Sequence, residues 1–259
     1  MSEENSISFK KNFFIATYEA AAFTMTRYPY LCAVLMMVTT AEESKTRQFD
    51  RTAFNYIYAH LGVAFVGGTL LSFDMFGLKR WTALAMAVQT IVISYDEYTL
   101  TKGEQIAMRL LCRNLGIIGC YLSVAGGIAK NKGAADKNKY LLTFGRQLIG
   151  AYTMLTAVLI WNSEEEFSSH AKALPGGALT VYIYIAVYMM CSICIYSGYE
   201  VVKMCKLLMC LLFAITLIVD MDVKMWTKHA GIGKWKTMTI AARHVPIISI
   251  LLLIRDGYY

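Results

Sequence analysis

Eight long apolar runs divide this chain of 259 residues, and they limit what it can fold into more than any other feature. A helix needs about 20 mostly apolar residues to cross a bilayer. These runs are continuous, whereas the strands of a membrane barrel alternate apolar with polar residues, so helices are expected. We therefore predict an all-α, polytopic membrane protein with eight transmembrane helices. The runs cover residues 20–40, 55–73, 78–95, 106–128, 140–161, 178–197, 201–219 and 237–254.

The composition agrees with this class. Hydrophobic residues make up 57% of the chain and charged residues only 17%. An average soluble domain is about half apolar and about a quarter charged. Little sequence remains between the runs, so no separate soluble domain is expected.

The second half of the chain repeats the first, four apolar runs at a time. The matched segments occur in the same order, at separations of roughly 120 to 130 residues, and a fixed period is typical of repeat architectures. Because each repeat has an even number of spans, the pattern predicts two parallel four-helix repeats. The matches are Thr24–Arg27 with Thr143–Arg146, Tyr56–Tyr58 with Tyr182–Tyr184, Lys79 to Asp96 with Lys203 to Asp220, and Arg113 to Ile118 with Arg243 to Ile248.

The repeat suggests four regions. Residues 1–19 form an N-terminal lead-in or interfacial segment, which lacks the short apolar core of a secretory signal and should stay in the mature protein. Residues 20–129 form the first repeat, 130–139 a basic linker loop, and 140–259 the second repeat. The lysines of the linker and the acidic loop Glu164–Glu166 on the other side favour cytoplasmic termini.

Five arginines lie within the apolar runs, where ionisable residues are costly and are default candidates for function. Arg27 and Arg146 lie about 10 Å into the membrane from the side that carries the chain termini, at 1.5 Å per residue. We predict Glu19 as an ion-pair partner of Arg27. Asp96 and Asp220 close the third and seventh runs at matching positions, and we predict them as partners of Arg113 and Arg243, across each repeat. The arginines are Arg27, Arg109, Arg113, Arg146 and Arg243.

Two interpretations of these arginines remain open. They can extend to the headgroups or form structural ion pairs, as long basic side chains do near helix ends. Alternatively, they can face a cavity between the repeats and bind an anion or a lipid headgroup, because guanidinium suits carboxylate and phosphate.

No catalytic, cofactor or metal motif accompanies the arginines, so we expect a protein that is not an enzyme and needs no cofactor. No nucleic-acid-binding motif supports the net charge of +7, so nucleic acid is not an expected partner. The expected surroundings are the lipid bilayer, with protein partners reached through the loops. Cys191 and Cys194 have redox spacing, but they lie in a span and are interpreted as small packing residues.

Five short motifs occur in a specific order along the chain. They are Met25–Pro29, Gly77–Trp81, Arg109 with Arg113 before Ile117–Gly119, Leu174–Gly177 and Ser197–Tyr199. Together they resemble the transmembrane protein 101 family, from about residue 12 to the end. The four-helix unit also resembles, more weakly, the DoxX-like and Surfeit-4 group.

The resemblance implies a multi-pass membrane protein with a suggested role in activating NF-κB signalling, and it implies no catalytic residues. The alternative function is a transporter or a lipid- or anion-binding protein that uses the arginines between the repeats. The first hypothesis depends on loops that recruit partners, and the second on a polar cavity within the membrane.

Overall fold

A computed structural model describes residues 3–45, 51–73, 77–100, 104–128, 137–230 and 233–255. Within these ranges every regular element is a helix, as the continuous apolar runs predict. The elements are α1 (Glu3–Glu43), α2 (Arg51–Phe73), α3 (Lys79–Leu100), α4 (Glu104–Ala125), α5 (Lys139–Asn162), α6 (Glu164–Ala173), α7 (Gly177–Ser197), α8 (Val201–Ile215), the π-helix η2 (Thr216–Asp220), α9 (Val223–Ala230), α10 (Lys234–Ala242) and α11 (His244–Arg255).

Six helical segments of the described chain are long and apolar enough to cross a membrane. The other two predicted runs lie in α3 and α5, helices of 22 and 24 residues whose length of about 33 to 36 Å also matches a bilayer. The all-α class and the membrane class are confirmed, while the number of eight spans stays a prediction. The six segments are Ile15–Glu43, Asn55–Phe73, Ala107–Ala125, Gly177–Ser197, Val201–Asp220 and Lys234–Ile254.

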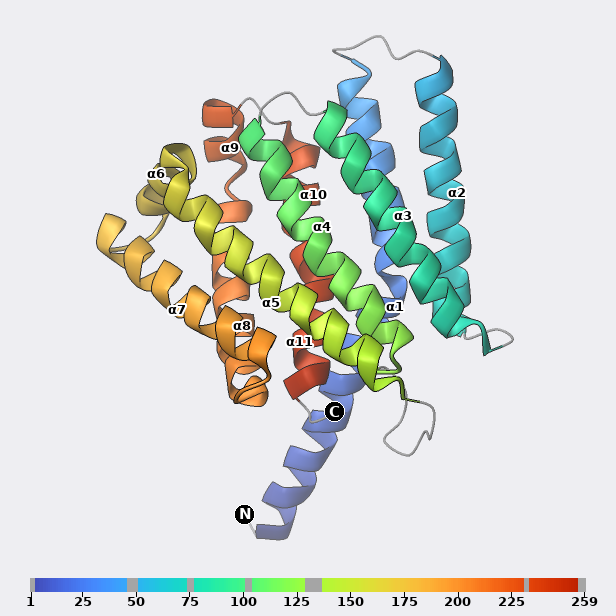
Figure 1. Ribbon diagram of the computed structural model, residues 1–259, viewed down its shortest axis with the longest axis vertical. Coiled ribbons are helices and arrows are strands. Elements are labelled where there is room, and N and C mark those ends of the chain that lie inside the picture. Colours follow the sequence, from blue (N-terminus) through green and yellow to red (C-terminus); the bar gives the residue numbers. More distant parts are fainter. Residues whose placement is uncertain are drawn as a thin grey trace.

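The long helices run up and down the bundle in alternation, so α1 begins and α11 ends at the same end (Figure 1). Helix α11 is central: it contacts α8 of its own half and α1 and α4 of the other half. Helices α4 and α5 pack along each other in front of it. The last helix and the α4–α5 contact therefore join the two halves.

Large apolar side chains point outward from the bundle, as expected of helices that face lipid. Phe23, Val66, Leu179 and Phe213 are all more than half exposed. The interior holds Ile, Leu and Tyr side chains together with Ala, Ser and Thr residues, and the small ones permit close helix contact in membrane proteins.

Two predicted runs contain breaks. The seventh ends in the π-helix η2, and the eighth divides at Arg243 into α10 and α11. Pro246 explains the second break, because it has no N–H to bond the carbonyl four residues earlier. The stretch Glu164–Glu166 was predicted to be a loop, which is wrong: it forms the first turn of α6, with Ser163 as its N-cap.

Helix α1 runs without interruption from the predicted lead-in into the first span, and its first turns extend beyond the bundle (Figure 1). The backbone therefore shows no boundary at residue 19. Most of the predicted basic linker, residues 130–136, lies outside the described residues.

Candidate functional site

Three of the five arginines predicted to matter are buried together at the end of the bundle opposite the chain termini. Arg109, Arg113 and Arg243 are each at most 6% exposed. Arg109 and Arg113 lie four residues apart on α4, a spacing that puts both side chains on one face of the helix.

The two arginines of α4 share one carboxylate. Oδ1 of Asp220, at the end of η2, accepts from Nη2 of Arg109 at 2.6 Å and from Nη2 of Arg113 at 2.8 Å. Arg109 also donates to both oxygens of Glu166 on α6, at 2.9 and 2.7 Å. All four side chains are at most 7% exposed, so two positive and two negative charges meet in the buried interior.

The segment that follows Asp220 also contacts the ion-pair cluster, through Trp226. The indole N–H of Trp226 donates to the carbonyl of Val219 at 3.0 Å, and its ring lies 4.3 Å from the guanidinium carbon of Arg109. This cation–π contact adds to the ion pairs that hold Arg109 in place. His244, at the start of α11, places Nδ1 3.2 Å from Oδ2 of Asp220.

Arg243 forms a second buried group with α3 and α4. Its Nη1 donates to Glu97 and to Oδ1 of Asn114, both at 2.9 Å, and its Nη2 also pairs with Glu97. The amide nitrogen of Asn114 donates to Glu97 at 2.9 Å. This group, like the first, joins a side chain of one half of the chain to side chains of the other.

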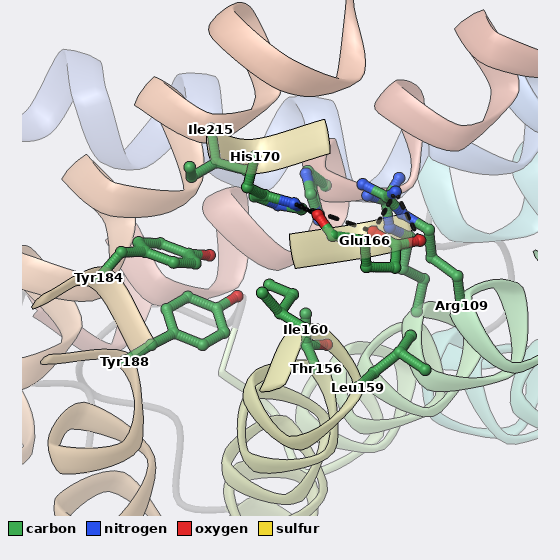
Figure 2. Close-up of a pocket in the computed structure, with 11 residues that line it drawn as sticks. Arg109, Thr156, Leu159, Ile160, Glu166, His170, Tyr184, Tyr188 and Ile215 are labelled. Atoms are coloured by element: carbon green, nitrogen blue, oxygen red, sulfur yellow. Dashed lines mark hydrogen bonds and ion pairs between the residues drawn. The ribbon is translucent and has the colours of Figure 1, made fainter. Parts of the chain in front are cut away.

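A small pocket opens beside Arg109, and Figure 2 shows the hydroxyls of Tyr184 and Tyr188 near its centre, with His170 and Glu166 on one side. It has room for about one water molecule. Two arginines, one carboxylate and several hydroxyl and imidazole groups are among its lining residues, but most of its exposed lining is apolar. The lining is Arg109, Arg113, Thr156, Leu159, Ile160, Glu166, His170, Tyr184, Tyr188, Ile215 and His244.

Comparison with known families decides the identity of the chain. Residues 10–256, nearly its whole length, match the TMEM101 protein family. The chain belongs to this family. Membership confirms the resemblance seen in the sequence motifs, and together with the apolar helices it fits a multi-pass membrane protein. No solved structure matches the chain.

In this TMEM101 family member, the other two arginines lie at the opposite end of the bundle, outside the pocket. The guanidinium carbon of Arg27 lies 3.5 Å from the ring centre of Phe23. Arg146 packs on the end of α7, where a Cβ built on Gly198 would lie 2.9 Å from its Nη1. Free carbonyls give this helix end a partial negative charge that favours a cation.

Two of the predicted ion-pair partners need correction. Glu19 is exposed and makes no ion pair with Arg27 in the described part of the chain, because eight residues on a helix separate them by about 12 Å. Asp96 accepts a hydrogen bond from Tyr56, and its neighbour Glu97 is the residue that reaches Arg243.

The third predicted partner, Asp220, does pair with arginine, but across the halves instead of within its own. Sequence reasoning missed Glu166, although a signal for it existed. Ser163 and Glu166 have the spacing of a capping box, and Oγ of Ser163 accepts from the Glu166 amide at 3.2 Å. That signal predicts a helix start, and hence a fixed side chain, where a loop was expected.

Acidification is expected to loosen α6. Burial and the nearby charge of Arg109 hold the pKa of His170 below its ordinary value of 6.5, so the ring is neutral in the folded protein. Below pH 6.5, His170 binds a proton more readily when α6 is detached from the bundle than when it is packed in place. The free energy that holds α6 on the bundle is therefore fully present above that pH and is lost as the pH falls, by up to about 1.4 kcal/mol per pH unit.

Amide hydrogen exchange of residues 164–173 at pH 7.5 and 5.5, corrected for intrinsic rates, measures this effect. His170→Gln should remove the pH dependence, whereas Lys172→Gln, on the same helix, should keep it. Equal protection of the wild-type helix at both pH values would contradict the expectation.

Proposed function

We propose that the protein is a non-catalytic membrane protein, built as two parallel four-helix repeats, that binds a small anion in the pocket between them. The pocket is the observation that carries this proposal. It brings two arginines of the first half together with donor groups of the second, and intramembrane charges that face an interior are typical of ligand pathways.

The helix contacts support the repeat. In the first half α1 packs on α2, α2 on α3 and α3 on α4. In the second half α5 packs on α7, α7 on α8 and α8 on α11. The contacts between halves, α1 with α11 and α5 with α4, also correspond to each other. This pattern is expected of repeats 20–129 and 140–259 related by an axis along the membrane normal.

The ion pairs follow the same relation. Arg113 of the first half binds Asp220 of the second, and Arg243 of the second half binds Glu97 of the first. We place the termini in the cytoplasm. These ion pairs hold the halves together at the opposite end of the bundle. A ligand bound among them would therefore sit where a relative movement of the halves opens or closes access.

The size and chemistry of the pocket limit the ligand. The pocket has space for about one water molecule, so even a small anion such as chloride or formate enters only when the surrounding side chains move outward. Guanidinium and hydroxyl groups are among the pocket's lining residues. A hydrogen bond from one of them to a charged partner contributes about 1.5 to 3 kcal/mol.

The test is an anion titration of the purified protein in lipid nanodiscs. Sodium formate or sodium chloride should raise the melting temperature, and sodium gluconate at the same ionic strength should not. Tyr188→Phe keeps the ring but removes a hydroxyl from the pocket, and should weaken binding about tenfold or more. Tyr121→Phe is the control, since Tyr121 is equally buried but does not line the pocket. If formate and chloride act no differently from gluconate, the proposal fails.

A second proposal comes from family membership: a role in NF-κB signalling through partners that bind the loops. The match over residues 10–256 favours it. Replacing Lys130, Lys132, Lys137 and Lys139 by Gln should then reduce the activity of an NF-κB-driven reporter while surface labelling shows normal insertion. Unchanged reporter activity would contradict it.

A further inference from the structure

The charges around the pocket balance before any ligand is bound. Arg109 and Arg113 contact Glu166 and Asp220, so the four side chains sum to zero when the neighbouring histidines are neutral. An anion added to this buried group leaves an uncompensated negative charge, and such a charge in a dry interior is strongly unfavourable. Anion binding therefore needs an additional positive charge from within the pocket.

His170 is placed to supply that charge. Its Nδ1 lies 2.7 Å from the carbonyl oxygen of Glu166. A carbonyl only accepts, so Nδ1 carries the hydrogen, and Nε2 is the basic nitrogen of the neutral ring. The ring lines the pocket beside Tyr184 (Figure 2), and Nδ1 lies 3.9 Å from Oε2 of Glu166, close enough for an ion pair once the ring is charged.

Charged and aromatic side chains from four helices face the His170 ring. Helix α6 presents Glu166, α4 presents Arg109, η2 presents Asp220 and α7 presents Tyr184. The pocket residues of α5 carry no charge. Burial and Arg109 lower the pKa of His170, so the empty pocket keeps the ring neutral near pH 7, and a bound anion opposes the effect of Arg109.

The second histidine of the pocket is less suited to the role. Nδ1 of His244 lies 2.6 Å from Oγ1 of Thr216, whose own hydrogen goes to the carbonyl of Leu212 at 2.6 Å. Nδ1 therefore donates to Thr216, with Asp220 nearby. Both arginines bond Oδ1 of Asp220, so its Oδ2, 3.2 Å from Nδ1, could hold a charged His244. His244, however, lies midway along the candidate span Lys234–Ile254, whereas His170 lies on α6, outside the candidate spans, and so closer to the water that supplies the proton.

We propose that the pocket takes up its anion together with one proton, which passes from bulk water to Nε2 of His170. This inference rests on the proposed function, because it requires that the pocket bind an anion. It makes the protein a proton-coupled anion-binding protein. The ligand class is then a monovalent anion, whose charge one imidazolium balances.

The experiment measures proton uptake and affinity together. Sodium formate is added to the protein in nanodiscs, in weakly buffered solution with a pH indicator, at several pH values between about 6 and 8. We expect about one proton taken up per formate bound, and an affinity that falls about tenfold for each unit of rising pH. Sodium gluconate gives the baseline.

Two histidine variants make the test specific. His170→Gln keeps a polar side chain but cannot become charged, so its formate binding should be weak and independent of pH. His60→Gln is the matched control, since His60 lies on α2 outside the pocket, and it should behave as wild type. If His170→Gln folds poorly, the number of protons that the wild-type protein takes up per formate bound still tests the coupling.

The outcomes separate the inference from the proposed function. Formate binding without proton uptake overturns the coupling and leaves the anion site standing. Uptake that persists in His170→Gln and disappears in His244→Gln overturns the assignment to His170. Absence of both formate and chloride binding overturns the proposed function, and the coupling with it.

Discussion

Replacing Asp220 with Asn is expected to lower the free energy of unfolding by about 3 to 5 kcal/mol. The Asp220 side chain is 0% exposed, and Oδ1 accepts from both Arg109 and Arg113. An amide cannot balance two guanidinium groups, so the variant leaves one net positive charge buried without compensation. Removing one partner of a buried pair costs more than the pair contributes, because the remaining charge stays desolvated.

The measurement is reversible unfolding of the purified protein in mixed micelles, with the melting temperature as a second readout. Glu200→Gln is the control: Glu200 pairs with Lys203 at 3.1 Å, but both side chains are exposed. Exposed pairs contribute about 0 to 1 kcal/mol, so this variant should unfold almost as wild type does. Similar losses in the two variants would show that the cluster around Asp220 does not hold the halves together.

Adding one methyl group where α4 meets α5 is expected to destabilise the bundle by about 1 to 3 kcal/mol. A Cβ on Gly145 would lie 2.4 Å from Oγ of Ser123 and 2.6 Å from the carbonyl oxygen of Gly119. A Cβ on Gly119 would lie 2.7 Å from the carbonyl oxygen of Gly145. Backbone atoms cannot move aside as a flexible side chain can, so Gly145→Ala must push the helices apart.

The control for Gly145→Ala is Gly62→Ala, in the middle of α2, where an added Cβ meets nothing within 4 Å. Alanine is the better helix former by about 1 kcal/mol, so this control should be neutral or stabilising. The readouts are the melting temperature and the fraction of monodisperse protein after extraction. Gly145→Ala that melts with or above wild type would mean that α4 and α5 do not approach this closely in the membrane.

Much of the fold is predictable because bilayer thickness and backbone hydrogen bonding act on single segments. Each apolar run became helix, and the motifs from Met25 to Tyr199 identified the family. The placement of Arg109 and Arg113 on one face of α4 also follows from local geometry, since four residues make about one helical turn.

The partners of these arginines were not predictable, because they depend on which helices pack together. Asp96 and Asp220 occupy matching places at the ends of their runs, yet Asp220 reaches α4 of the other half and Asp96 meets Tyr56. Glu166 lies outside the eight apolar runs, and only the packing of α6 against α7 and η2 brings it to Arg109.

The sequence by itself therefore determined the membrane class, the helices and the presence of costly charges within them. The reason is that lipid imposes its requirement on each segment separately, through length, hydropathy and internal hydrogen bonding. Only the tertiary structure decided that three arginines turn inward, that each half supplies the carboxylate for the other, and that a water-sized pocket lies among them. Ion pairs between residues 107 and 146 positions apart exist only once the helices are packed, because the distances between their charged atoms are set by packing and not by spacing along the chain.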